Sequence, residues 1–169
     1  DVYLVMDEDF YSLVSVGALK NLDLLLSDDS EADCNLFYQS ACQAGEYQGK
    51  QYALPMECNP TLMFVNKTLL KKEGIEVPDH DWTWDDFYEI CKEVTKDSDG
   101  DGRIDQFGYC DYTWIQAVYS NGIRPFNEDG TESYFTDERF IESIQFVKKL
   151  QQINDNYLAS SNDFDLGKV

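Results

Sequence analysis

Residues 47–70 read YQGKQYALPMECNPTLMFVNKTLL, and this stretch decides the fold of the chain. Gln48-Gly49 is a turn dipeptide between two short runs, which predicts a hairpin. An extended run follows, and a polar break at residues 57–60 separates it from a second extended run at residues 61–65. Asn66-Lys67 then predicts the start of a helix. The stretch is therefore expected to cross from one group of secondary-structure elements to another.

The composition is that of a folded, strongly acidic protein. The chain has 169 residues, of which 43% are hydrophobic and 14% aromatic, enough for one domain or two small lobes with real cores. The formal net charge is -20. Nucleic acids and anionic membrane surfaces bind through basic patches, so the charge argues against both as partners.

The cysteine pattern gives no metal-binding motif. No two of the five cysteines form a CxxC pair, and the only histidine is His80, so a structural zinc site is not expected. We interpret most of the cysteines as small core residues, and their odd number leaves at least one thiol free. They are Cys34, Cys42, Cys58, Cys91 and Cys110.

Hydrophobic spacing predicts strands that alternate with helices. Residues 2–6 form a continuous apolar run typical of a buried parallel strand. A helix is expected after it and should end at Gly17, and a weaker helix is expected over residues 31–44. Thr83 and Thr136 are each expected to cap a later helix, because acidic residues and a periodic apolar face follow each of them.

A third helix is expected over residues 112–120, which completes an α/β pattern. The strands are too few to close a sheet. The chain starts inside an apolar run and stops where a further element is expected to begin, so we expect a piece of a longer protein, truncated at both ends.

Five segments carry a resemblance to a known family. They are DVYLVMDEDFYSLVSVGALKNLD, the crossover at residues 47–67, and residues 81–95, 106–130 and 135–153. In this order they resemble the extracellular solute-binding proteins of ABC transporters, the family that includes maltose-binding protein. The sequence departs from the family pattern at Ile123, which follows Gly122 where the family has a second glycine.

The resemblance implies a periplasmic-binding-protein-like fold with two α/β lobes and a hinged cleft, present here in part and with incomplete sheets. Residues 1–58 would belong to the first lobe and residues 59–169 to the second. The implied function is that of the substrate-binding component of an ABC importer, which binds a sugar or oligosaccharide in the interlobe cleft without catalysis. The implied partner is a membrane permease, and the implied location is extracellular, as a cell-surface lipoprotein or in the periplasm. The full-length form is expected to be a monomer.

The resemblance also places candidate ligand-binding residues near the crossover. Glu8 follows the first predicted strand, at the end where ligands bind in open α/β sheets. Its alternative role is that of an acid stabilised by a helix dipole. Glu57 and Asn59 match cleft-lining positions, and their alternative is an ordinary polar loop. Sugar hydroxyls both donate and accept hydrogen bonds, so they suit carboxylates, which accept, and amides, which do both.

A second group of candidates precedes the predicted helix at residues 112–120. Trp114 matches an aromatic residue near the cleft, and its alternative is a core residue on the helix face. Asp111 and Tyr112 are secondary candidates. We assign Trp82 and Trp84 to packing and capping, not to ligand binding.

The loop KDSDGDGRID at residues 96–105 resembles a calcium-binding loop through nine positions. The twelfth position, where a bidentate Glu belongs, is Gly108. Calcium would offset the repulsion among the carboxylates, and the alternative is an acidic surface turn without metal. The expected ligands are Asp97, Asp99 and Asp101, the Arg103 carbonyl and Asp105.

Two other functions compete with solute binding. A glycoside hydrolase would also have cleft carboxylates and aromatic rings, but no distinctive pair of acids stands out. A calcium-dependent interaction module would use such loops, although this chain has a single one. Nucleophilic catalysis with His80 is not expected, and neither is an organic cofactor, because no phosphate-binding glycine-rich loop occurs.

Overall fold

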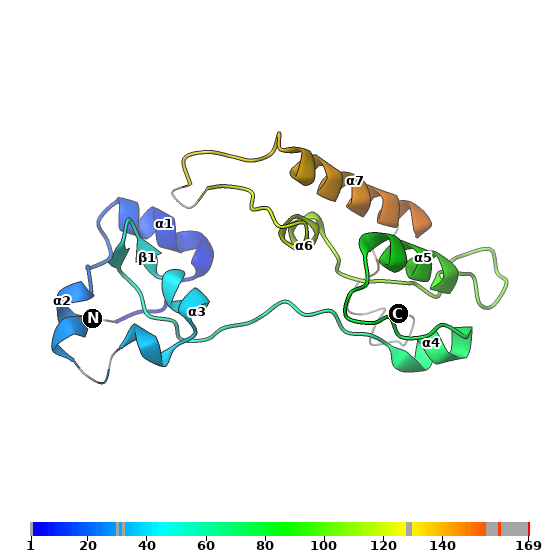
Figure 1. Ribbon diagram of the computed structural model, residues 1–169, viewed down its shortest axis with the longest axis horizontal. Helices are drawn as coiled ribbons and strands as arrows, with labels where there is room; N and C mark the ends of the chain where they lie inside the picture. Colours follow the sequence, from blue (N-terminus) through cyan, green and yellow to red (C-terminus); the bar gives the residue numbers. More distant parts are fainter. Residues whose placement is uncertain (1, 30, 32, 128–129, 155–158, 160–168) are drawn as a thin grey trace. The chain divides into compact units, whose positions relative to one another are not determined.

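The computed structural model describes residues 2–29, 31, 33–127, 130–154, 159 and 169 (Figure 1). The chain forms two compact units, Asp1–Leu62 (unit 1) and Met63–Val169 (unit 2). The described residues contain short helices and one two-stranded sheet. No described helix combines the length and the apolar character that crossing a membrane requires.

Unit 1 is built from short elements. Its helix α1 ends before Gly17, whose φ of 73° is left-handed and closes the helix as predicted. The weaker helix expected over residues 31–44 is instead two separate pieces, η1 and α3. The elements are α1 (Asp7–Ser15), α2 (Asp23–Asp28), η1 (Cys34–Leu36), α3 (Gln39–Gln43), β1 (Glu46–Tyr47) and β2 (Lys50–Gln51).

The predicted hairpin at Gln48-Gly49 is confirmed. The two residues have φ angles of 51° and 72°, the left-handed pair that suits a two-residue hairpin turn. The strands β1 and β2 are antiparallel, with Tyr47 opposite Lys50. Gln51 ties the hairpin to the rest of unit 1, because its carbonyl accepts a hydrogen bond from the backbone N–H of Leu22 at 2.8 Å.

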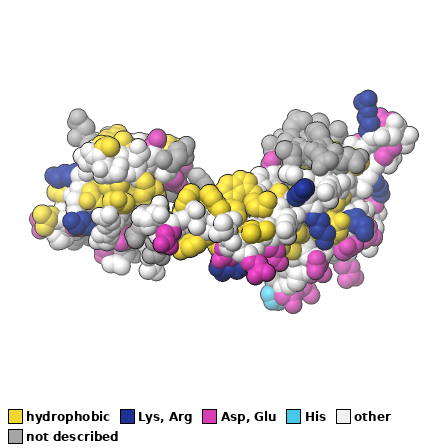
Figure 2. All heavy atoms as spheres, turned by 90° about the horizontal axis from the view of Figure 1, so that it is seen from above, with side chains coloured by type: hydrophobic (Ala, Val, Ile, Leu, Met, Phe, Trp, Pro, Cys, Tyr) yellow, Lys and Arg dark blue, Asp and Glu magenta, His cyan; other side chains and the backbone are white. Residues whose placement is uncertain are grey.

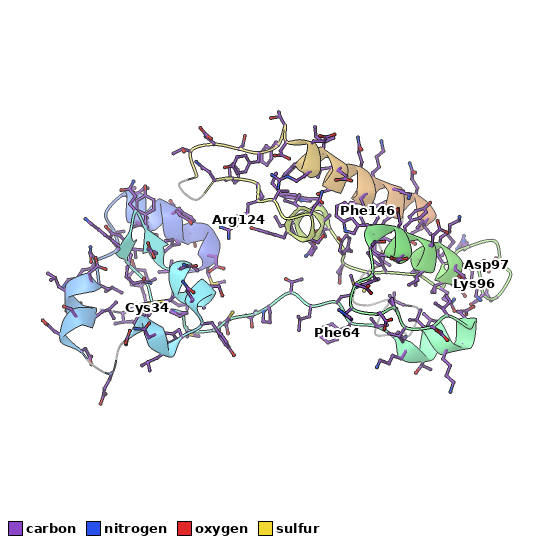
Figure 3. The ribbon with its side chains drawn as sticks, in the orientation of Figure 1. Cys34, Phe64, Lys96, Asp97, Arg124 and Phe146 are labelled. Carbon is purple, nitrogen blue, oxygen red and sulfur yellow. A yellow bond between two sulfur atoms is a disulfide. The ribbon has the colours of Figure 1, made fainter. Side chains whose placement is uncertain are left out.

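The strands expected at residues 2–6 and 61–65 do not form. Both segments lack strand structure, and their apolar side chains are largely exposed, including Leu4 and Phe64. Phe64 is labelled in Figure 3. A strand must pair its backbone N–H and C=O groups with a neighbour. Among the described residues, neither segment has such a partner strand, so the apolar pattern of each segment was not sufficient to predict a strand.

The described part of unit 2 contains four helices, α4 (Lys67–Glu73), α5 (Trp84–Val94), α6 (Trp114–Ser120) and α7 (Glu138–Ile153). Helix α7 packs against both α5 and α6 (Figure 1). Phe146 on α7 stacks on Trp84, with ring centroids 4.4 Å apart. Trp82 contacts Phe87 of the same core, so the assignment of Trp82 and Trp84 to packing is confirmed.

Side-chain caps fix where the helices of unit 2 begin. Thr83 caps α5 as predicted and forms a capping box with Asp86. The helix start predicted at Asn66-Lys67 is also confirmed, and Asn66 Oδ1 accepts a hydrogen bond from the Leu69 N–H at 3.0 Å. The cap predicted at Thr136 is wrong. Asp137 is the N-cap of α7, because its carboxylate accepts the Arg139 N–H at 2.9 Å.

The cysteines differ from one another in environment. Cys34 and Cys42 form a disulfide between η1 and α3, which the interpretation as core thiols did not foresee. Cys91 is a buried core residue as expected, and burial raises the pKa of its thiol to about 12. Cys58 is exposed, contrary to a core role.

Candidate functional site

The crossover candidates Glu57 and Asn59 are exposed and lie side by side. The Asn59 amide donates a hydrogen bond to Glu57 Oε1 at 3.2 Å. Among the described residues, no backbone–backbone hydrogen bond involves residues 54–64. Because both residues are exposed, most of the hydrogen-bonding capacity of their side chains is open to a ligand.

The candidate Glu8 is the second residue of α1. Its side chain lies outside the described part of the structure. Its position agrees equally with the ligand-binding role and with the alternative of an acid near a helix N-terminus.

Trp114, at the start of α6, is partly packed and partly free. Its ring lies 6.0 Å from the Phe140 ring, yet 44% of the residue is exposed. Tyr112 is more deeply engaged, since its ring packs edge-on against Phe87 at 5.2 Å and its hydroxyl lies 3.2 Å from Ser120 Oγ. Trp114 thus has surface available for a ligand, whereas Tyr112 serves the core.

The third residue of this group, Asp111, is exposed and has a φ of 52°. Asp is one of the few non-glycine residues that occupy the left-handed region without large strain. The turn at Asp111 leads into Thr113, whose N–H donates to Gln116 Oε1 at 2.9 Å and so fixes the first turn of α6. The structure therefore brings Asp111, Tyr112 and Trp114 together at one helix start.

The acidic loop draws three carboxylates together, as the calcium-like pattern predicted. Oxygen atoms of Asp97, Asp99 and Asp101 all lie within 4.8 Å of one another. Asp97 accepts hydrogen bonds from the N–H groups of Gly102 and Gly100, each at 2.7 Å (Figure 3 labels Asp97). These bonds lower the pKa of Asp97 and keep it ionised.

Asp105 and Arg103 take part in the loop differently. The Asp105 carboxylate accepts the N–H of Ser98 at 2.7 Å and its hydroxyl at 2.8 Å, which lowers the pKa of Asp105. Arg103 donates its N–H to Asp101 Oδ1 at 2.8 Å. Asp105 is not in the group of three converging carboxylates, so its predicted role as a ligand stays a prediction.

The base of the loop is closed by polar contacts that sequence reasoning missed. Lys96 and Gln106 pair through backbone hydrogen bonds of 3.0 Å and 3.1 Å. The Lys96 ammonium forms an ion pair with Glu73, which also accepts a hydrogen bond from the Gln106 amide at 3.1 Å. The hydrogen-bonded contact with Lys96 is the largest cause of the lowered pKa of Glu73, and the hydrogen bond from Gln106 is the next largest. Residues so far apart give no sequence signal of their contact.

Sequence reasoning also missed a row of rings that starts at Trp114. We call Trp114, Phe140, Phe135 and Phe126 the aromatic row. Successive centroids are 6.0, 4.9 and 5.4 Å apart. Phe140 is buried, whereas Trp114, Phe135 and Phe126 are 44%, 47% and 48% exposed.

Comparison with solved structures shows that these units have the fold of ABC substrate-binding proteins. The protein from Listeria monocytogenes solved in complex with cycloalternan superimposes with a TM-score of 0.69 at 23% identity, covering 96% of this chain and 44% of that one. CpMnBP1 with mannobiose bound gives a TM-score of 0.66 at 24% identity, covering 95% and 43%. The predicted fold, a partial substrate-binding protein with incomplete sheets, is confirmed.

The family described as bacterial extracellular solute-binding protein matches residues 1–167, and the chain belongs to it. It is a family of extracellular binding proteins. The arabinooligosaccharide-binding protein of Halalkalibacterium halodurans is 25% identical over 134 residues, which cover 78% of this chain and 29% of that protein. The arabinooligosaccharide-binding protein of Bacillus subtilis is 33% identical over 81 residues, covering 46% and 18%.

The chain thus spans less than a third of the length of these two curated relatives. The division into unit 1 and unit 2 falls at residues 62 and 63. The assignment of residues 1–58 and 59–169 to the two lobes of the family stays a prediction, as do the ligand contacts of the six candidate residues.

Proposed function

We propose that this chain is part of the sugar-binding component of an ABC importer, with an oligosaccharide as its ligand. The observation that carries the proposal is the family match over residues 1–167. Two relatives are named for arabinooligosaccharides, and the two solved proteins hold cycloalternan and mannobiose. The exposed groups of this chain suit the same chemistry.

In unit 1, the proposed contacts with sugar hydroxyls come from Glu57 and Asn59, with Glu8 as a further carboxylate. In unit 2, Asp111 bonds sugar hydroxyls and the exposed part of Trp114 covers an apolar sugar face, while Tyr112 holds the start of α6 in place from the core. The protein binds and releases its ligand unchanged, hands it to a membrane permease, and works outside the cytoplasm as a lipoprotein or periplasmic protein.

A panel of arabino-, manno- and malto-oligosaccharides tests this proposal by calorimetry and thermal shift. A ligand at about 100 times its Kd adds about 2.7 kcal/mol of stability, which a melting curve resolves. Glu57→Gln and Trp114→Ala should each weaken binding. Glu46→Gln, at an exposed position outside the site, is the matched control and should bind as the original chain does.

If no saccharide raises the melting temperature or gives heat, the proposed function is wrong for this chain. Release of reducing sugar from any oligosaccharide would instead favour the alternative of a glycoside hydrolase. A protein partner captured only with calcium present would favour the interaction module.

We also propose a structural calcium ion in the acidic loop. The convergence of Asp97, Asp99 and Asp101 supports it, because oxygen donors within such reach are what Ca²⁺ prefers. The carboxylates keep lone pairs beyond those that accept backbone N–H groups. Calcium would supply charge neutralisation and would clamp the loop that joins α5 to Gln106.

Calorimetric titration with CaCl₂ tests the calcium proposal. The original chain should bind Ca²⁺ and melt at a higher temperature with it, and Asp99→Asn should reduce both effects. Asp79→Asn, an exposed acid outside the loop, is the control. Absence of heat and of a thermal shift in the original chain would leave an acidic turn without metal.

A further inference from the structure

Asp111 differs from the other exposed acids of the chain in the conformation of its backbone. Figure 2 shows many acidic side chains at the surface, so exposure alone does not mark a site. The φ of Asp111 is 52°, and among the described residues the only other non-glycine residue with a positive φ is Gln48, in the hairpin turn. A sparsely populated conformation of this kind persists where the surrounding structure holds it.

A residue far away in the sequence supplies one of the contacts that hold Asp111. The Ala159 carbonyl accepts a hydrogen bond from the Asp111 N–H at 3.3 Å. Ala159 is 4% exposed, so other parts of the chain enclose it. The bond therefore attaches the turn at Asp111 to a buried residue and gives its N–H a partner within the protein.

The residues that follow Asp111 are anchored by other contacts. The Tyr112 ring packs edge-on against Phe87 at 5.2 Å. The Thr113 N–H donates to Gln116 Oε1 at 2.9 Å, at the start of α6. The backbone of Asp111 thus lies between the Ala159 bond and the anchored start of α6, and it has little freedom to turn.

The Asp111 side chain, in contrast, is open. It is exposed, and in the part of the chain that the structure describes its carboxylate takes part in no hydrogen bond or ion pair. The loop acids Asp97 and Asp105 differ, because their carboxylates accept backbone N–H groups. A carboxylate on a fixed backbone accepts a hydroxyl from a ligand with little loss of conformational freedom.

We propose that Ala159 is a positioning residue for the sugar site: its carbonyl holds the left-handed turn at Asp111 and so sets the direction of the Asp111 carboxylate. This role rests on the proposed function. Ala159 is buried and acts on the ligand through Asp111. A change at Ala159 should therefore weaken binding only while the Asp111 carboxylate is present.

Amide hydrogen exchange without ligand tests whether Ala159 holds the turn. In the original chain the Asp111 N–H should exchange at least about tenfold more slowly than an unprotected amide. Ala159→Leu puts a larger side chain into a buried position, which should displace the carbonyl and remove most of this protection. Ala159→Ser adds one atom and should keep the protection. An unprotected Asp111 N–H in the original chain would overturn the inference, even if Ala159→Leu folds poorly.

A double-variant cycle by calorimetry tests whether Ala159 acts through the carboxylate, with an arabino-, manno- or malto-oligosaccharide that binds in the panel. Asp111→Gly removes the carboxylate, suits the left-handed turn and should weaken binding about tenfold, as expected for one hydrogen bond to a charged group. Ala159→Leu should weaken binding about threefold to tenfold in the original chain and less than about twofold in the Asp111→Gly background. Equal losses in the two backgrounds would overturn the inference.

Val94→Ala is the control for a general loss of stability. Val94 is buried in a different cluster, with Leu69 and Leu70. Its truncation should lower the melting temperature but leave the Asp111 N–H protected and the affinity within about twofold of the original. If Val94→Ala weakens binding as much as Ala159→Leu does, the effect of Ala159 is one of stability and not of positioning.

The outcomes distinguish the positioning role from the proposed function. If a saccharide binds and the cycle shows no coupling, Ala159 does not position the carboxylate, while the proposed function stands. If no saccharide binds, both fail.

Discussion

Unit 1 and unit 2 are stabilised in different ways. The described part of unit 2 contains three hydrophobic clusters, and Leu150, Val118 and Cys91 in them are fully buried. Among the described residues of unit 1, the buried hydrophobic side chains are Phe10, Val14 and Cys42, and this unit adds a disulfide and a two-stranded sheet. Stability in unit 2 thus comes mainly from apolar burial, whereas unit 1 depends on local bonds and a cross-link.

The variant expected to have the largest effect on this comparison is Phe146→Ala. Phe146 is buried and packs against Trp84, Phe87 and Tyr112, so its removal should destabilise unit 2 by about 3–5 kcal/mol. All three tryptophans lie in unit 2, so their fluorescence during urea unfolding reports on unit 2 alone.

Phe64→Ala is the matched control, because Phe64 is 79% exposed and its loss should change stability by less than about 0.5 kcal/mol. Hydrogen exchange in unit 1 should be unaffected by Phe146→Ala. A parallel loss of protection in unit 1 would contradict the independence of the two units.

Removal of the disulfide is the second test and should act on unit 1 alone. Cys34 and Cys42 are 8 residues apart, and closing a loop of this size contributes about 2–3 kcal/mol. The double variant Cys34→Ser, Cys42→Ser should therefore open residues 33–44 to proteolysis while the tryptophan transition stays in place.

Cys58→Ser serves as the control for the loss of a sulfur atom, because Cys58 is exposed and outside the disulfide. Equal protease resistance in the disulfide variant and in the original chain would show that unit 1 does not need the cross-link.

A third and smaller effect is expected from Tyr109→Phe in unit 2. The Tyr109 hydroxyl is buried and has no hydrogen-bond partner in the part of the chain that the structure describes. Since such a group costs free energy, its removal should raise the stability of unit 2 by about 1 kcal/mol.

Tyr112→Phe is the comparison variant. It loses the contact of the Tyr112 hydroxyl with Ser120 and should not stabilise unit 2. If Tyr109→Phe lowers the urea midpoint, the hydroxyl has a favourable partner after all.

The smallest expected effect is a difference in acid sensitivity. The described part of unit 2 has five carboxyl groups with a lowered pKa, and the described part of unit 1 has one, Asp33. The five in unit 2 are Glu73, Asp86, Asp97, Asp105 and Asp137. A lowered pKa contributes stability that is present above the unfolded pKa, about 4, and is lost as the pH falls through the folded pKa.

Unit 2 should accordingly lose more stability than unit 1 between about pH 5 and pH 2. Urea unfolding at a series of pH values measures the loss of stability in each unit. Tryptophan fluorescence monitors unit 2, and hydrogen exchange monitors unit 1. Glu73→Gln should reduce the dependence of unit 2 on pH, and an unchanged slope in that variant would contradict the assignment to Glu73.

The sequence predicted the fold well where signals are local. The hairpin at Gln48-Gly49, the end of α1 at Gly17, the helix start at Asn66-Lys67 and the cap at Thr83 were all predicted correctly, because each depends on a few neighbouring residues. The cap at Thr136 was off by one residue, since Thr136 and Asp137 are both good caps and only the turn geometry chooses between them.

The candidate site was predictable only in part. The convergence of the loop carboxylates follows from their alternate spacing and the glycines between them, and it is seen in the structure. The ligand contacts of Glu57, Asn59 and Trp114 stay predictions, because their identity came from the resemblance to a family and not from the residues themselves.

The sequence by itself determined the turns, the caps, the acidic loop and the membership of a solute-binding family, because these depend on short-range chemistry and on ordered motifs. Only the tertiary structure decided that residues 2–6 and 61–65 are not strands, that Cys34 pairs with Cys42, and that Trp114 continues into an aromatic row. A strand, a disulfide and a row of rings each need a partner that is brought near by folding, and the pattern of one segment does not name that partner.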